Sequence, residues 1–331
     1  MPARSSVVDD GNLIIFGGRS SSELTNRICQ VLDMQPGGAR ITEFPDGEIF
    51  VKLEEDVRGK DCYVVVSTCE PVNNNLMELL IFIDTLRRAS AGRITVVMPY
   101  MGYARQDRKD EGRVPITAKL VANLITAAGA QRVLALDLHA AQIQGFFDLP
   151  VDHLSATPEF IKYFRARREE LGDLCLVSPD VGNVKVAEGM ANKLGGDLAI
   201  INKRRLSGSK VESANLIGDV KNKTVLMFDD MISTAGTVCE AAKLVMERGA
   251  KDVIAAATHP VLVGPAVDRL LASPISKIVV CNTVPFGERT KPLRGKLVEL
   301  CVGSLLGQAI LRIHTNQSVS ALFKDTAGPK R

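Results

Sequence analysis

The sequence has no paired cysteine motif, no long apolar run and no excess of one charge. Its seven cysteines are scattered without a C-x-x-C pair, which argues against a disulfide framework or a zinc site and predicts a reducing, cytoplasmic environment. No run approaches the roughly 18 apolar residues of a membrane span, and residues 1–12 lack the apolar run of a signal peptide. We therefore expect neither a secreted nor a membrane protein.

Charge and glycine motifs exclude further classes. The chain has 41 basic and 38 acidic residues, a net charge of +3, which is too balanced to indicate a nucleic-acid binder or an acidic tail. Neither G-x-x-x-x-G-K-[ST] nor G-x-G-x-x-G occurs, so Walker-type and dinucleotide sites find no support. Trp is absent and aromatic residues make up only 5% of the chain.

The 331 residues suggest two domains, at about 150 residues per domain. Short β-branched runs alternate with helical patterns, which predicts an α/β fold with mainly parallel sheets flanked by helices. The expected helices cover Asn75–Ala89, Thr117–Ala128 and Thr237–Arg248. The expected strands are Leu13–Phe16, Cys62–Val66, Ile94–Met98, Val133–Leu136, Leu174–Val177, Leu198–Ile201, Thr224–Phe228, Val253–Ala257 and Lys277–Cys281.

The two halves of the chain resemble each other. Gly129-Ala130-x-x-Val133-x-Ala135-x-x-x-His139 recurs 120 residues later as Gly249-Ala250-x-x-Val253-x-Ala255-x-x-x-His259. The helices before these two motifs, which start at Thr117 and Thr237, align at the same offset of 120. The strands before the helices, Thr95–Met98 and Thr224–Met227, match at an offset of 129, so the first half carries nine extra residues between strand and helix. Two copies of one α/β unit explain the match, although small and β-branched residues also coincide by chance. Ligands in open α/β sheets bind at the carboxyl ends of strands, so these two loops are the candidate sites.

The second-half loop has the composition of a phosphate site. Asp229 and Asp230 end a strand and are followed by Ser233-Thr234-Ala235-Gly236-Thr237 before a helix. Backbone N–H groups and hydroxyls at a helix N-terminus bind anions, whereas the two carboxylates suit sugar hydroxyls or a cation. A phosphorylated sugar fits both parts. The alternative is an N-capping Ser or Thr beside two solvated acids.

The first-half loop, residues 99–115, is dense in charge and includes Arg105, Gln106 and Asp110. Arg and Gln bind base edges or phosphates, but a solvated surface loop is the other interpretation. Asp137 and His139 end the next strand, where residues two apart share a face. Asp180 follows another strand and is a further candidate carboxylate.

A cationic stretch follows the strand that ends at Ile201. Lys203-Arg204-Arg205 leads into a Gly- and Ser-containing segment, which suits a lid that closes on a polyphosphate. The alternative is a basic hairpin turn that faces water.

Together these residues resemble the ribose-phosphate pyrophosphokinase family over nearly the whole chain. The specific signatures are Phe44-Pro45-Asp46-Gly47-Glu48, Tyr103–Asp107, Ala118–Asn123, Asp137–Phe147 and the tail Ser318–Phe323. The resemblance implies two tandem phosphoribosyltransferase-like domains, which we expect at residues 1–155 and 156–331. It implies that, with Mg²⁺ as cofactor, ATP and ribose 5-phosphate react to give AMP and phosphoribosyl pyrophosphate. The latter product would serve nucleotide, histidine and tryptophan biosynthesis. It also implies a homo-oligomer, usually a hexamer.

The resemblance also implies residue roles. Arg105, Gln106 and Asp110 would bind ATP, with Phe44, Asp46 and Glu48 gripping adenine from a neighbouring subunit. His139 and Asp180 would serve the metal–ATP complex. The ribose hydroxyls would bind to Asp229 and Asp230. The 5-phosphate would bind to Ser233, Thr234, Ala235, Gly236 and Thr237. Lys203 and Arg205 would be the catalytic cations. Phosphate or ADP effectors would act near Arg58, Ser318, Ser320 and Phe323.

Four positions depart from the family pattern: Ser233, Asn183, Val186 and Ala141. Three alternative functions stay open. A non-catalytic regulatory homologue would bind catalytic subunits, although Lys203, Arg205, His139, Asp229 and Asp230 argue against it. A phosphoribosyltransferase would consume phosphoribosyl pyrophosphate, which the Arg105–Asp110 loop and the duplicated domain disfavour. A nucleic-acid-binding regulator is the least supported, because the charge balance indicates no basic face.

Overall fold

The computed structural model describes residues 11–179, 182–205 and 211–326. Within these ranges it describes the backbone alone for residues 203–205, 211–214 and 324–326. Contacts divide the chain into two compact units. The first contains the residues up to Ala156 together with Thr283–Pro285 and Cys301–Asp325, and the second contains Thr157–Asn282 and Phe286–Leu300. The C-terminal segment thus groups with the first unit, unlike the continuous division expected at residue 155.

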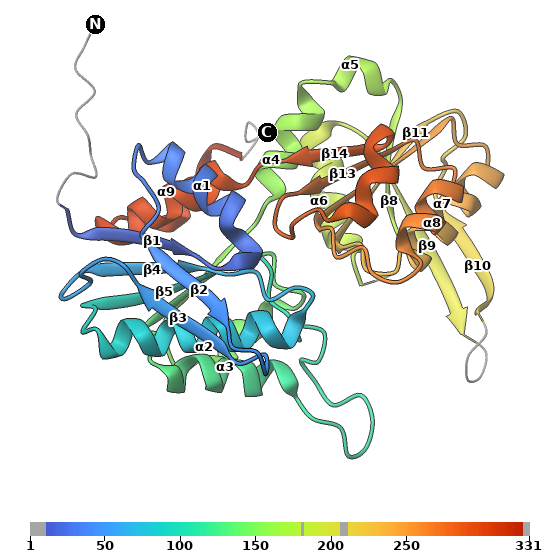
Figure 1. The fold of residues 1–331 in the computed structure, drawn as a ribbon. Coiled ribbons are helices and arrows are strands. Elements are labelled where there is room, and N and C mark those ends of the chain that lie inside the picture. Colours follow the sequence, from blue (N-terminus) through green and yellow to red (C-terminus); the bar gives the residue numbers. More distant parts are fainter. Residues whose placement is uncertain (1–10, 180–181, 206–210, 327–331) are drawn as a thin grey trace, which may run out of the picture. The chain divides into compact units, whose positions relative to one another are not determined.

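The first unit is built on a five-stranded sheet with the order β1-β4-β5-β6-β7, in which every neighbouring pair is parallel (Figure 1). A separate antiparallel hairpin, β2–β3, packs on helix α2. The elements are β1 (Leu13–Gly17), η1 (Arg19–Ser21), α1 (Ser22–Val31), β2 (Ala39–Glu43), β3 (Ile49–Leu53), β4 (Asp61–Val65), α2 (Val72–Arg88), β5 (Arg93–Met98), α3 (Thr117–Ala128), β6 (Arg132–Leu136), η2 (Ala141–Phe146), β7 (Val151–Leu154), α9 (Gly303–His314) and η4 (Val319–Thr326).

Alternation along the strands divides the first core between two faces. Ile14, Cys62 and Val96 pack with Leu79 and Phe82 of α2, because successive strand residues point to opposite sides of a sheet. The C-terminal helix α9 packs closely against α1. This packing explains why the C-terminal segment belongs to the first unit.

The second unit is built on a seven-stranded sheet with the order β10-β9-β8-β11-β12-β13-β14. All its neighbours are parallel except β9 and β10, which are antiparallel. The elements are α4 (Thr157–Arg165), α5 (Arg168–Leu171), β8 (Leu174–Ser178), α6 (Val184–Leu194), β9 (Asp197–Arg205), β10 (Val211–Ile217), β11 (Thr224–Met231), α7 (Gly236–Glu247), β12 (Asp252–His259), α8 (Ala266–Ala272), β13 (Lys277–Cys281), η3 (Glu288–Gly295) and β14 (Leu297–Leu300).

The expected α/β class is confirmed, with parallel sheets flanked by helices. The repeated sequence corresponds to β5-α3-β6 in the first unit and β11-α7-β12 in the second, each with a parallel strand pair. On α7, Ala241, Ala242 and Val245 are buried in the core of the second unit. No helix in the described ranges is long and apolar enough to cross a bilayer.

Candidate active site

In the second unit, two carboxylates lie where β11 ends. Asp229 and Asp230 are half-buried, and the Asp229 Oδ1 atom accepts a 2.9 Å hydrogen bond from the backbone N–H of Asp230. The amide of Asn183, at the start of α6, donates to the carbonyl of Phe228 at 2.7 Å and lies 3.4 Å from Asp229 Oδ1. Asn183, one of the departures from the family pattern, therefore orients the first carboxylate.

The turn after these carboxylates presents unpaired backbone donors. Ala235 has φ +58°, in the left-handed region, and α7 begins at the next residue. Within the described ranges, the N–H groups of residues 234–237 have no protein acceptor, and the buried hydroxyl of Ser233 has no partner. The guanidinium of Arg269 donates to the carbonyl of Thr234 at 3.0 Å and holds the turn. Free N–H groups at a helix N-terminus form an anion site.

Strand β9 is longer than expected. The predicted strand ended at Ile201, but β9 continues to Arg205 and pairs with β10, with Lys203 opposite Ala214 and Arg205 opposite Val211. Antiparallel pairing with β10 carries the strand past the apolar run, which is why the hydrophobic pattern ended too early. The two cations thus belong to a β-hairpin, and their side chains lie outside the described ones.

In the first unit, one pocket of about 440 Å³ collects four candidate residues. Arg105, Gln106, Asp110 and His139 all line it, together with the start of η2. Its volume falls in the usual range of about 300–1,000 Å³ for small-molecule sites. The long loop after β5 and the turn after β6 therefore meet at the carboxyl edge of one sheet.

The long loop is anchored at both ends. The hydroxyl of Thr68 accepts the N–H of Gly102 at 2.7 Å, and a Cβ at Gly102 would collide with the Thr68 carbonyl. At the other end, the Thr117 hydroxyl donates to the side-chain oxygen of Gln106 at 2.5 Å. In the middle, Gln142 donates to Asp107 at 2.8 Å. These contacts argue against a simple solvated loop.

The turn after β6 corrects one expectation. Strand β6 ends at Leu136 and Asp137 has φ +38°, so the alternation that would place Asp137 and His139 on one face does not continue. The Asp137 carboxylate accepts the N–H of Ala156 at 2.9 Å, whereas the exposed His139 lines the pocket. Asp180 lies outside the described residues. Among those described, no three His, Cys, Asp or Glu side chains gather to hold a metal ion.

The β2–β3 hairpin carries the remaining nucleotide candidates. Its tip is tight, since Phe44 N–H donates to the carbonyl of Glu48 at 2.8 Å and Gly47 has φ +91°. Phe44 is 52% exposed and makes an edge contact with Phe50, with 5.9 Å between ring centroids. Asp46 and Glu48 are also exposed.

The residues matched to an effector site all lie in the first unit. Arg58 donates to the Ser90 hydroxyl at 3.2 Å. In the tail, the hydroxyls of Ser318 and Ser320 are 2.8 Å apart, and Phe323 is half-buried.

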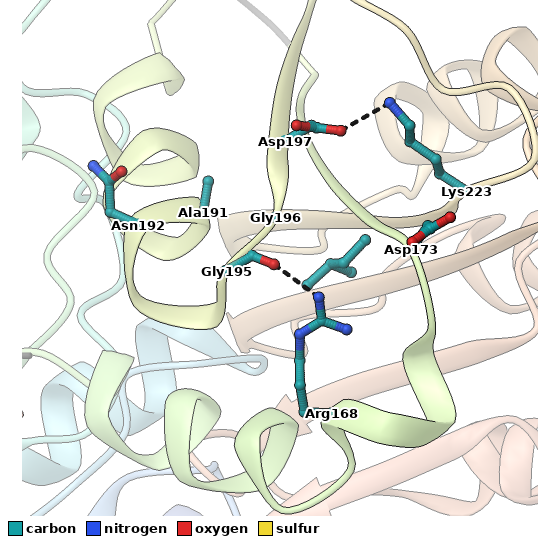
Figure 2. A pocket seen from close by; sticks show the side chains of 9 residues that line it. Arg168, Asp173, Ala191, Asn192, Gly195, Gly196, Asp197 and Lys223 are labelled. Carbon is teal, nitrogen blue, oxygen red and sulfur yellow. Dashed lines mark hydrogen bonds and ion pairs between the residues drawn. The ribbon is translucent and has the colours of Figure 1, made fainter.

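A larger pocket of about 810 Å³ lies at the amino ends of β8 and β9 in the second unit (Figure 2). Its cations are already engaged: Lys223 bonds Asp197 at 2.8 Å, and Arg168 donates to the carbonyls of Leu194 and Gly195 at 2.9 and 2.8 Å. The two acids that line the pocket, Asp173 and Asp197, balance its two cations, so this pocket offers no surplus positive charge for a phosphate.

Sequence reasoning missed two residues that shape the sites, His153 and Gln142. His153 accepts the backbone N–H of Leu138, and Gln142 joins η2 to the long loop. Gln142 lies within the DLHAAQIQGFF signature, so its place beside His139 was a usable signal. His153 carries no local signal, because only strand pairing brings it beside the turn.

Comparison with sequence families supports this reading of the chain. Residues 13–129 match a family described as the N-terminal domain of ribose phosphate pyrophosphokinase, and residues 204–324 match a phosphoribosyl synthetase-associated domain. A ribose-phosphate pyrophosphokinase from Rhodopirellula baltica is 56% identical, over 95% of this chain and 99% of that protein. One from Bacillus subtilis is 50% identical, over 95% of this chain and 98% of that protein.

A solved structure leads to the same family. The phosphoribosylpyrophosphate synthetase from Mycobacterium smegmatis is 44% identical, with a TM-score of 0.87, and the match covers 92% of this chain and 99% of that one. Identity of this size over nearly full length on both sides indicates common descent of both units. The chain therefore belongs to the ribose-phosphate pyrophosphokinase family and is an enzyme of that type.

Proposed function

We propose that this protein transfers the β,γ-diphosphoryl group of MgATP to the C1 hydroxyl of ribose 5-phosphate. The C1 oxygen attacks the β-phosphorus in line, the bond from that phosphorus to the α,β-bridging oxygen breaks, and AMP leaves. The other product is phosphoribosyl pyrophosphate. Such a transfer asks the protein for positioning and charge neutralisation more than for covalent catalysis.

The observation that carries this proposal is the turn after β11. Unpaired N–H groups of residues 234–237 and the orphaned Ser233 hydroxyl suit the 5-phosphate, which accepts hydrogen bonds. Asp229 and Asp230 lie directly before this turn and suit the ribose hydroxyls, which donate hydrogen bonds. A phosphate group alone would not explain two carboxylates at the same edge.

ATP is assigned to the pocket of the first unit. Arg105 supplies a cation for phosphates, whereas Gln106 and Asp110 offer hydrogen-bonding groups. The exposed hairpin with Phe44, Asp46 and Glu48 would grip adenine in a neighbouring subunit. We therefore include a homo-oligomer, as a hexamer, in the proposal.

Mg²⁺ is best treated as part of the substrate MgATP. Mg²⁺ prefers oxygen ligands and keeps several waters, and the described residues form no cluster of three metal-ligating side chains. An ion that keeps several waters needs few protein ligands, which suits an ion carried by the ATP phosphates. His139, in the pocket, and Asp180 are the residues we assign to that complex.

Lys203 and Arg205 are assigned as the catalytic cations. Their backbones lie on the β9–β10 hairpin, and a hairpin is a suitable carrier for side chains that approach a bound polyphosphate. Positive charge delivered there would stabilise oxygens whose negative charge grows in the transition state.

Regulation and location complete the proposal. Phosphate or ADP would act near Arg58, Ser318, Ser320 and Phe323. The protein would work in the cytoplasm, a reducing compartment in which cysteines stay free.

The test is incubation of the purified protein with MgATP and ribose 5-phosphate, followed by separation of AMP and ADP. We expect AMP and phosphoribosyl pyrophosphate in equal amounts. ADP as the main product would indicate an ordinary kinase, and no turnover would favour a regulatory homologue. Pyrophosphate release from phosphoribosyl pyrophosphate and a free base would instead indicate a phosphoribosyltransferase.

A further inference from the structure

The turn after β6 is held in an unfavourable backbone conformation. Asp137, a residue with a side chain, has φ +38°, and such conformations persist only where the surrounding structure holds them. The N–H of Asp137 donates to the carbonyl of Leu154 at 2.9 Å, and its carboxylate accepts the N–H of Ala156. Strand β7 and the residues after it therefore hold the first residue of the turn.

The second residue of the turn is held by a side chain. The N–H of Leu138, which is buried, donates to Nε2 of His153 at 2.9 Å. His153 stands on the edge strand β7, opposite Ala135 of β6. The other ring nitrogen, Nδ1, lies 3.3 Å from the side-chain amide of Gln144 in η2. Because Nε2 accepts the Leu138 N–H, Nδ1 carries the ring proton, and it can bond Gln144 only through the amide oxygen of that residue. The bond to Leu138 is therefore the contact that joins β7 to the turn.

The ring must be neutral to do this. An imidazole accepts a hydrogen bond only at an unprotonated nitrogen, and the protonated ring has none. Burial lowers the pKa of His153, although the nearby charge of Asp137 opposes the shift. The effect of burial is the larger one, so the pKa is lowered overall and Nε2 stays available as an acceptor near neutral pH.

The third residue of the turn is the one that faces the pocket. His139 lines the pocket with Arg105 and Asp110, and Gln142, three residues further on, donates to Asp107 of the long loop. If the N–H of Leu138 lost its acceptor, the turn would move and shift His139 relative to Arg105. A displacement of about 1 Å is enough to weaken a positioned site considerably.

We propose that His153 is a positioning residue for nucleotide binding: by accepting the Leu138 N–H through Nε2, it fixes the turn that presents His139 to the pocket. The proposal rests on the proposed function of that pocket as the MgATP site. His153 itself does not line the pocket, so it acts only through the turn.

A matched pair of variants tests this role. In His153→Gln the amide oxygen reaches about as far as Nε2 and keeps an acceptor, whereas His153→Met has the same length but only a weak acceptor. We expect the Met variant to raise KM for MgATP about tenfold, because the buried N–H of Leu138 would lose its hydrogen-bond partner. KM for ribose 5-phosphate should stay within about twofold, and the Gln variant should stay close to the parent protein in both constants.

Hydrogen exchange supplies a readout apart from activity. The Leu138 amide should exchange slowly in the parent and the Gln variant and much faster in the Met variant. Asp152→Asn, one residue before His153 on β7, is the control, because it weakens the ion pair with Arg132 of β6 without touching the turn. This control should leave KM for MgATP and Leu138 exchange unchanged.

Two results would overturn the proposal. One is a Met variant with parent-like KM for MgATP and a protected Leu138 amide. The other is equal loss of affinity for both substrates in the Met and Gln variants, which would show general destabilisation. Failure of the parent protein to form AMP would count against the proposed function alone, because the exchange comparison tests the hydrogen bond without turnover.

Discussion

Single residues in rare backbone conformations shape both candidate sites. Asp137 and Ala235 have φ +38° and +58°, and each lies just after a parallel strand. At Ala235 the left-handed backbone turns the chain into α7 and leaves N–H groups facing outward. At Asp137 it ends the strand alternation and directs the carboxylate to Ala156. In both cases one positive φ angle sets the direction that the chain takes after the strand.

The assignment of Lys203 as a catalytic cation is tested at this scale. Lys203→Ala should lower kcat by about 10³-fold with little change in either KM, because a contact made in the transition state leaves substrate binding intact. Steady-state kinetics with AMP detection measures both constants. Lys221→Ala removes an exposed lysine of the same unit and serves as the matched control. A raised KM with unchanged kcat would contradict the assignment.

Among the elements, helix α2 links three parts of the first unit. Its Glu78, whose side chain is fully buried, accepts both the backbone N–H and the Nε–H of Arg19, at 2.8 and 2.6 Å. The Nη1 atom of the same arginine donates at 2.6 Å to Glu43, which is the residue just before Phe44. These hydrogen bonds, that to Glu78 foremost, raise the pKa of the Arg19 guanidinium. The tip end of the β2–β3 hairpin is thereby tied to α2.

Replacing this buried carboxylate should therefore destabilise the first unit. We expect Glu78→Ala to lower the free energy of unfolding by about 2 kcal/mol. The loss is smaller than for a fully buried ion pair, because the Arg19 side chain is 40% exposed and water replaces part of the interaction. Urea unfolding followed by circular dichroism measures it.

The control for this change is Glu23→Ala on α1. Glu23 is 84% exposed and lies 4.0 Å from Arg27, and exposed pairs contribute about 0–1 kcal/mol. An equal effect of the two substitutions would show that burial of Glu78 does not matter.

At the scale of the whole molecule, the chain forms two units with separate cores, and its C-terminal segment returns to the first. A partly buried network secures this return: Asp61 of β4 bonds Nε of Arg93 at 2.7 Å and Nδ1 of His314 in α9 at 2.7 Å. Six of the seven cysteines are buried within the units, and only Cys301 is exposed.

This distribution predicts the thiol reactivity of the native protein. Burial raises the pKa of Cys29 and Cys62 to about 12 and that of Cys175 to about 11. Since the thiolate is the reactive species, these thiols should react slowly. Ellman's reagent should titrate one thiol rapidly, and Cys301→Ser should abolish that phase. A second fast thiol in the native protein would contradict the burial described here.

The sequence alone was sufficient for the elements and residues whose signals are local. Continuous apolar runs marked the central strands, since strands covered on both faces need apolar residues throughout. Helix α3 begins and ends as predicted, at Thr117 and Ala128. The strands β2, β3, β7, β10 and β14 were missed, because most lie at sheet edges or in the separate hairpin and carry mixed polar patterns.

Only the tertiary structure decided which distant residues meet. The pairing of β6 with β7 brings His153 to Leu138, and the start of α6 brings Asn183 to Asp229. The packing of α9 on α1 places the C-terminal segment in the first unit. These contacts depend on strand order and on helix packing, which residues neighbouring in sequence do not specify. Local chemistry was therefore readable from the chain itself, whereas the positioning of that chemistry required the folded arrangement.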